Sequence, residues 1–158
     1  MKSVLFVCTG NICRSPSAEA ILRHKLESTK LKNNIIIDSE ATHNYHVGNT
    51  PDPRVINEGN KRGISFNNIV SRQVTYDDYH QFDLILAMDK GHYLTLIQNK
   101  PKNSPASIEL FLEYSGFQYF SAVSDPYYGS AQGFSDMFDV LIEAIDKLII
   151  KILYQNKK

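Results

Sequence analysis

The sequence has little cysteine, and neither sign of charge is in excess. Only two of its 158 residues are cysteine, which excludes the disulfide framework of small secreted domains. Seventeen basic residues balance seventeen acidic ones, which argues against a nucleic acid or a membrane surface as partner. No apolar run is long enough to cross a bilayer, and Met1-Lys2 leads straight into an expected strand instead of a signal peptide. We therefore expect one soluble cytoplasmic domain over residues 1–158.

One short loop near the start carries most of the chemical information. Residues 3–7 form an apolar, β-rich run of the length of a buried parallel strand. Residues 8–15 follow with the sequence Cys-Thr-Gly-Asn-Ile-Cys-Arg-Ser. A helix is expected to begin at Ser15-Pro16, with Pro16 at the favoured first position. A loop between a strand and a helix N-terminus turns its N–H groups inward, which predicts an anion site.

The side chains of this loop suit attack on a phosphoryl group. Cys8 taken alone is typical of a small buried hydrophobe, but a helix N-terminus and a nearby arginine favour a reactive thiolate. Arg14 can hold two phosphoryl oxygens at once, and the loop amides add to this stabilisation. Ser15 can donate a hydrogen bond to the thiolate. Gly10 allows close approach of the anion, and Asn11 tolerates a left-handed backbone.

Several ordered motifs resemble those of one enzyme family. Residues 8–19 look like the signature loop of the low-molecular-weight protein tyrosine phosphatases. The likeness continues in the family's order at 38–39, 46–48, 51–54, 71–73, 82–89 and 125–129, and so covers nearly the whole chain. This resemblance implies metal-independent hydrolysis of phosphotyrosine and aryl phosphate monoesters through a cysteinyl-phosphate intermediate, with no cofactor.

The resemblance assigns three catalytic roles. Cys8 corresponds to the nucleophile, Arg14 to the phosphate-binding arginine and Asp125 to the general acid and base. An acid is chemically sensible, because tyrosine otherwise departs as a phenoxide whose conjugate acid has a pKa of about 10. Asp125-Pro126 is also typical of a turn, and the two interpretations agree because catalytic residues commonly lie on loops.

Further residues are expected to bind the substrate: Thr9, Gly10, Asn11, Ile12, Cys13, Ser15, Tyr45, Tyr127 and Tyr128. The tyrosines are expected to stack on the substrate ring. The chain departs from the family at Tyr45, where many members have tryptophan, and at Glu40-Ala41, where many have Ala-Gly. We expect Glu40 to add negative charge near the entrance. Some members support the loop with a histidine near Ile69, and this chain has none between His46 and His80.

The family also suggests a redox role for Cys13 and a set of partners. In many members a second thiol captures the oxidised nucleophile as a disulfide, which implies the same role for Cys13 towards Cys8. The expected partners are a phosphotyrosine protein or peptide and, as inhibitors, inorganic phosphate and similar oxyanions. We expect a monomer or a weak dimer.

Strand and helix patterns alternate along the chain. We expect strands at 34–38, 82–88 and 107–111 besides the first, helices at 53–62 and 90–98, and long loops at 40–52 and 112–130. Apolar residues at helical spacing between 134 and 152 predict a long C-terminal helix whose apolar face is core. This alternation predicts a single-domain, three-layer α/β sandwich. Its four-stranded parallel sheet, in the flavodoxin-like order 2-1-3-4, has helices on both faces, and the Cys8 loop lies at the switch point.

Three alternatives are weighed against this assignment. A flavodoxin-like FMN carrier also binds phosphate at the first turn, but it has no use for Cys8 and Arg14, and it would be yellow. An inactive phosphotyrosine-binding module would not need Cys8, Arg14 and Asp125 together. Thiol-dependent arsenate reductases share a similar loop but relay a disulfide through further cysteines, and none follows Cys13.

Overall fold

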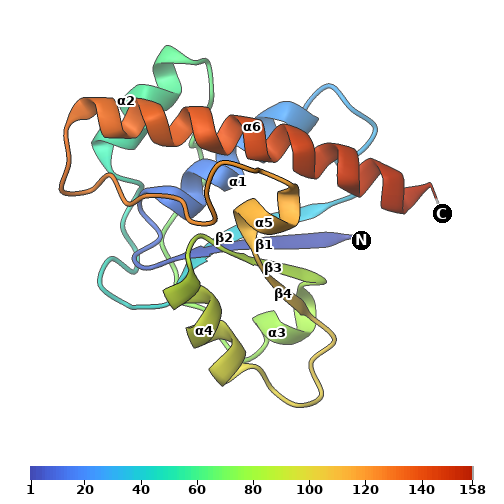
Figure 1. Cartoon of the computed structure of the whole chain (residues 1–158). Coiled ribbons are helices and arrows are strands. Elements are labelled where there is room, and N and C mark those ends of the chain that lie inside the picture. Colours follow the sequence, from blue (N-terminus) through green and yellow to red (C-terminus); the bar gives the residue numbers. More distant parts are fainter. Residues whose placement is uncertain (158) are drawn as a thin grey trace.

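Four parallel strands form the central layer of the computed structural model, which describes residues 1–157 (Figure 1). The strands are β1 (Ser3–Cys8), β2 (Ile36–Ala41), β3 (Leu84–Ala87) and β4 (Ser107–Leu110). Their order in the sheet is β2-β1-β3-β4, which confirms the predicted topology. Every residue of β1 is buried, because both of its neighbours and both layers of helices cover it.

Helices cover both faces of the sheet and form two cores. Val4 and Phe6 of β1 face one core, to which α1 (Arg14–Leu26), α2 (Pro53–Lys61), α5 (Phe111–Ser115) and α6 (Ala131–Asn156) contribute. Leu5 and Val7 point to the opposite core, below which lie α3 (Asp78–Gln81) and α4 (Lys90–Asn99). The alternation follows from the two-residue period of a strand. The three-layer sandwich is thereby confirmed.

The long C-terminal helix α6 packs along α1 (Figure 1). Its apolar residues at helical spacing are almost completely buried, among them Phe134, Phe138, Leu141, Ile145, Leu148 and Ile152, so the interpretation of this face as core is confirmed. None of the helices within residues 1–157 is both long and apolar enough to span a membrane.

The structure shifts several predicted boundaries. Strand β2 spans residues 36–41 instead of 34–38. Its polar residues obscured it in the sequence; Ser39 is held by buried hydrogen bonds, and Asp38 and Glu40 pair with Arg72. Helix α1 begins at Arg14, so that Pro16 is its third residue. The first residues of the expected loop 112–130 belong to α5, which ends at Ser115. Gly116 follows the helix with a left-handed backbone (φ 92°). The short helix α3 is unpredicted, since four residues give too little periodicity.

The order of the strands creates a crevice at one end of the sheet. From β1 the chain crosses to β2 on one side, and later returns to β3 on the other side of β1. The segments that follow β1 and β3 therefore diverge from adjacent strand ends, which is where ligands bind in open α/β sheets. The loop that begins after Cys8 lies at this point, as predicted.

Candidate active site

The loop between β1 and α1 curls tightly around its own backbone. Asn11 has a left-handed backbone with φ 56°, which confirms the expectation for this residue. At Gly10, an added Cβ would lie 2.8 Å from Cδ2 of His46. Glycine is thus required here by the packing of His46 as well as by the expected approach of an anion.

The Cys8 thiol ends β1 at the floor of this loop. Its Sγ lies 2.9 Å from the hydroxyl oxygen of Ser15 and 3.5 Å from the Ser15 backbone nitrogen. Both groups are near enough to donate to the sulfur, which is the geometry that the predicted support from Ser15 requires; the same hydroxyl also lies 3.3 Å from the Glu40 carbonyl oxygen. Cys8 itself is only 3% exposed, and it lines the cavity described below.

Arg14 is held rigidly at the other end of the loop. Its Nη1 donates to Oδ2 of Asp89 at 3.0 Å and to the carbonyl oxygen of Val123 at 3.2 Å. Its Nη2 lies 3.5 Å from the Thr9 hydroxyl and 3.5 Å from Oδ2 of Asp125. Four acceptors from three segments thus surround the guanidinium, and the side chain of Arg14 is 5% exposed.

Asp125 lies at the rim of the site, with its side chain 45% exposed. Its Oδ1 accepts a hydrogen bond from the backbone of Tyr127 at 3.1 Å. Arg54 of α2 donates to the carbonyl oxygen of Tyr127 and lies over the rings of Tyr127 and Phe134. Asp52 in turn binds the Arg54 guanidinium, and these hydrogen bonds lower the pKa of Asp52. Arg54 therefore anchors the segment that carries Asp125.

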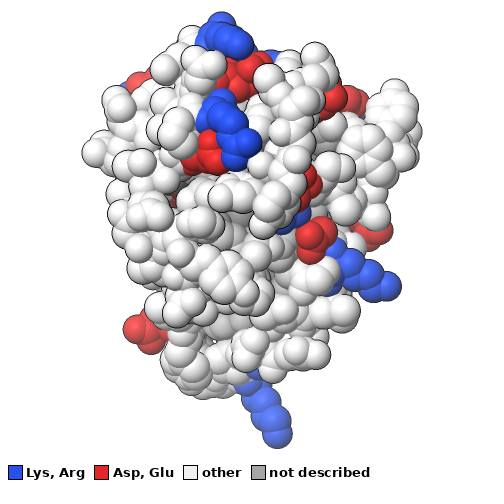
Figure 2. Space-filling model, turned by 90° about the vertical axis from the view of Figure 1, so that its left-hand side faces the viewer, with Lys and Arg blue, Asp and Glu red and all other residues white. Residues whose placement is uncertain are grey.

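These groups surround a cavity of about 380 Å³. It is lined by Cys8, Thr9, Gly10, Ile12, Cys13, Arg14, Tyr45, His46, Asp125, Tyr127 and Tyr128. Two predicted substrate residues, Asn11 and Ser15, do not line it and instead support the loop from behind. Figure 2 shows this end of the molecule, where charged side chains are scattered over a mainly uncharged surface.

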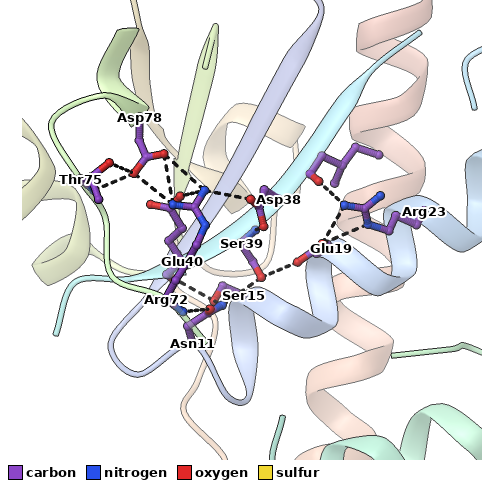
Figure 3. Close-up of polar contacts among 11 residues, drawn as sticks. Asn11, Ser15, Glu19, Arg23, Asp38, Ser39, Glu40, Arg72, Thr75 and Asp78 are labelled. Atoms are coloured by element: carbon purple, nitrogen blue, oxygen red, sulfur yellow. Dashed lines mark hydrogen bonds and ion pairs between the residues drawn. The ribbon is translucent and has the colours of Figure 1, made fainter. Parts of the chain in front are cut away.

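A buried chain of hydrogen bonds supports the loop from behind (Figure 3). The Asn11 amide donates to the hydroxyls of Ser15 at 2.8 Å and Ser39 at 2.9 Å. Ser39 donates to Oε2 of Glu19 at 2.6 Å, and Arg23 donates to the other oxygen of that carboxylate. The chain thus runs from Ser15, which contacts Cys8, out to the surface of α1.

The segment after residue 70 supplies the support that some family members draw from histidine. The hydroxyl of Ser71 donates to the Gly10 carbonyl oxygen at 2.9 Å, and the backbone N–H of Arg72 donates to Oδ1 of Asn11 at 3.2 Å. Arg72 is itself held by Asp38 and Asp78. The loop is therefore tied to a charged cluster and needs no imidazole there.

The expectation that Glu40 adds negative charge near the entrance is wrong. Glu40 is fully buried behind the loop, where it pairs with Arg72 beside Asp78 (Figure 3). Burial, followed by its hydrogen bond with Asp78, raises the pKa of Glu40 to about 10. Burial alone would also raise the pKa of Asp78, but the hydrogen bonds from Glu40 and Thr75 lower it. Glu40 is thus a neutral acid and Asp78 a carboxylate.

Sequence reasoning missed two residues that contact the loop, Asp89 and His92. Asp89 follows β3 and caps α4 by accepting from the His92 backbone at 3.0 Å; its place after a buried strand was the available signal. Burial alone would raise the pKa of Asp89, but the His92 backbone and Arg14 lower it. The ring of His92 reaches Thr9 from the first turn of α4, a contact that only the fold creates.

Cys13 is buried beside the cavity as a free thiol. Burial, and then the negative charges of Asp52 and Cys8, raises its pKa. Cys13 is therefore a neutral thiol, in contrast to the role expected of Cys8.

Comparisons with known proteins agree with this geometry. The family model "Low molecular weight phosphotyrosine protein phosphatase" matches residues 3–158. A protein of that name from Schizosaccharomyces pombe is 42% identical over 89% of this chain and 90% of its own length, and one from Gallus gallus is 42% identical over 96% of each chain. The crystal structure of a protein tyrosine phosphatase from Entamoeba histolytica, with Hepes in its active site, matches with a TM-score of 0.90, 37% identity and full coverage of both chains.

Replacing Glu40 by glutamine should change how stability depends on pH. The pKa of Glu40 is raised from an ordinary value of 4.5 to about 10, so its contribution to stability is full below pH 4.5 and is lost as the pH rises towards 10. Glutamine does not titrate. The free energy of unfolding of Glu40→Gln, relative to the wild type, should therefore increase between pH 5 and 9, by up to ~1.4 kcal/mol per pH unit.

Urea unfolding at several pH values measures this difference. Glu113→Gln, on the exposed side of α5, is the matched control for the loss of a carboxylate. A difference for Glu40→Gln that depends on pH no more than that of this control would mean that Glu40 is ionised in the folded protein.

Proposed function

Because the chain belongs to the low molecular weight phosphotyrosine protein phosphatases, we propose that Cys8, Arg14 and Asp125 together hydrolyse phosphotyrosine in the cavity that these three residues line. One observation carries this assignment. A thiol from the end of β1, a guanidinium from the start of α1 and a carboxylate from a distant loop converge on the same cavity. Together they supply a nucleophile, an anion clamp and a proton donor, which are the groups that transfer of a phosphoryl group to sulfur requires.

In the first step the Cys8 thiolate attacks phosphorus. A sulfur–phosphorus bond forms as the bond between phosphorus and the tyrosine oxygen breaks. Protonated Asp125 gives its proton to that oxygen, so that neutral tyrosine leaves. The hydroxyl and backbone N–H of Ser15, at 2.9 and 3.5 Å from Sγ, favour the thiolate before attack.

In the second step water attacks the cysteinyl phosphate. Asp125, now ionised, takes a proton from the water while the oxygen–phosphorus bond forms and the sulfur–phosphorus bond breaks. Inorganic phosphate leaves and Cys8 returns to the thiolate. The exposed position of Asp125 at the rim suits both steps, because the leaving tyrosine and the incoming water use the open side of the cavity.

Substrate binding is proposed to depend on Arg14 and the rim tyrosines. Phosphate oxygens would displace Asp125 from Nη2 of Arg14, while Asp89 and Val123 keep Nη1 in place. Tyr45 and Tyr128 are largely exposed, and Tyr127 packs edge to face against Tyr128. These rings offer faces on which the substrate ring can stack, and the mainly uncharged surroundings suit protein substrates without a strict charge preference.

We also propose a cytoplasmic location and a monomer or weak dimer. The location is supported by the two free cysteines, because reducing surroundings keep such thiols available. Inorganic phosphate and similar oxyanions are proposed as competitive inhibitors, since they fit the same loop and guanidinium.

Cys8→Ser tests the covalent mechanism. A serine hydroxyl in this position is not ionised, so the substitution should abolish turnover of an aryl phosphate. Weak phosphate binding should remain, because Arg14 and the loop are intact. Initial rates and competition by phosphate provide the measurement. The control is Ser124→Ala, because Ser124 is an exposed residue that directly precedes Asp125. Substantial activity in Cys8→Ser would overturn the cysteinyl-phosphate intermediate.

Asp125→Asn should show a loss that depends on the leaving group. Turnover of phosphotyrosine should fall by roughly 10²–10⁴-fold, the usual range for general acid catalysis. An aryl phosphate with an acidic phenol needs little protonation, so its phosphorylation step should fall much less. Burst kinetics on the two substrates separate this step from dephosphorylation. Equal losses in the phosphorylation step on the two substrates would assign the role of general acid to another residue.

Peroxide treatment tests the proposed role of Cys13. Oxidation converts Cys8 to a sulfenic acid, and the Cys13 thiol can displace water from it to form a disulfide that thiols reduce. The wild type should regain activity after dithiothreitol. Cys13→Ser should regain a much smaller fraction of its own starting activity, because Cys8 proceeds to irreversible oxidation. Equal fractional recovery in the two proteins would exclude this role.

A further inference from the structure

A buried histidine that the proposed reaction does not use lies against the phosphate-binding loop. His92, in the first turn of α4, is 5% exposed. Its Nε2 lies 2.7 Å from the hydroxyl oxygen of Thr9, the residue that directly follows the nucleophile. This is a short, partly buried contact between the helix after β3 and the loop after β1, at the end of the sheet where the two segments diverge.

The surroundings of the ring indicate which partner donates. Nδ1 of His92 lies 3.1 Å from Oδ1 of Asp89, although not with the angle of a good hydrogen bond. The carboxylate favours a proton on Nδ1, which leaves a lone pair on Nε2 to accept from the Thr9 hydroxyl. Burial, and next the positive charge of Arg14, lowers the pKa of His92 to about 4, so the ring is neutral at neutral pH.

This arrangement also fixes the orientation of the Thr9 hydroxyl. Its hydrogen points to His92, so its remaining lone pairs face Nη2 of Arg14 at 3.5 Å. Asp89 contacts both ends of the arrangement, with Oδ1 beside His92 and Oδ2 accepting from Nη1 of Arg14. Asp89, His92, Thr9 and Arg14 therefore form a closed ring of polar contacts, in which the guanidinium joins Thr9 to Asp89.

We propose that His92 and Thr9 are positioning residues that orient Arg14 for the phosphoryl group. His92 holds the Thr9 hydroxyl as an acceptor for Arg14, so that the guanidinium is already in the plane that phosphate oxygens require. This inference rests on the proposed role of Arg14 in binding phosphate. Neither residue exchanges a proton with the substrate; both act through the arginine.

The test compares variants that remove one contact at a time. Thr9→Val removes the hydroxyl and keeps the shape, whereas Thr9→Ser keeps the hydroxyl. His92→Leu removes the acceptor, whereas His92→Gln keeps a polar atom near the position of Nε2. The measurements are kcat and KM for an aryl phosphate, and the inhibition constant of inorganic phosphate. His80→Gln, at an exposed histidine of α3, is the matched control.

Thr9→Val and His92→Leu should each lower kcat/KM about tenfold, because small errors in the placement of a catalytic group are costly. The inhibition constant of phosphate should rise by a similar factor. The double variant should be little worse than either single one, since both break the same contact. Thr9→Ser and His92→Gln should recover most of the loss.

Three results would overturn the proposal: additive losses in the double variant, a Thr9→Ser as impaired as Thr9→Val, or an unchanged inhibition constant of phosphate. If His92→Leu does not fold, as judged by thermal unfolding, the comparison of Thr9→Val with Thr9→Ser decides alone, because Thr9 is only partly buried. Arg14→Lys distinguishes a failure of the proposed function from a failure of the positioning role of His92 and Thr9. Full activity in Arg14→Lys would overturn the proposed function, whereas a loss there with none in Thr9→Val would overturn only the positioning role.

Discussion

The burial of one amide side chain, that of Asn11, gives the site its shape. Asn11 is fully buried, its backbone is left-handed, and its side chain contacts Ser15, Ser39 and the backbone of Arg72. Removing the amide would take one hydrogen bond from each of three groups, the hydroxyls of Ser15 and Ser39 and the N–H of Arg72, at a cost of ~0.5–1.5 kcal/mol each. The hydrogen bonds therefore hold a strained conformation that the loop would not adopt alone. Because Ser15 also contacts Cys8, the same amide helps to set the surroundings of the Cys8 thiol.

The charged cluster behind the loop follows from the same constraint. Strand β2 brings Asp38 and Glu40 to Arg72, and Asp78 approaches the same arginine from α3. Three ionised carboxylates around one arginine would leave two uncompensated negative charges. A neutral Glu40 halves that excess, which adds to the effect of burial in raising the pKa of Glu40, while hydrogen bonds from Glu40 and Thr75 lower the pKa of Asp78. Such clusters are weak sources of stability; here the cluster fixes the Arg72 backbone that supports Asn11.

Sequence alone predicted the features that depend on local pattern. The four parallel strands, the long C-terminal helix and the left-handed Asn11 follow from periodicity and residue type. The extent of β2 and the burial of Glu40 could not be predicted in this way. Polar residues in a strand are typical of an exposed edge, unless a distant partner such as Arg72 is known. The contact between His92 and Thr9 joins residues 83 positions apart. Only the strand order brings them together, and no local pattern contains that information.

The charges around Arg14 bear on how the substrate would bind. Without substrate, one guanidinium contacts two carboxylates, those of Asp89 and Asp125. Asp89 is held from the other side by α4 and stays ionised, since its pKa is lowered. A phosphate dianion that enters the loop as proposed would therefore compete with two carboxylates for one guanidinium. Asp125 is the more exposed of the two and lies farther from the guanidinium, at 3.5 Å against 3.0 Å for Asp89, so it is the carboxylate that the phosphate would displace.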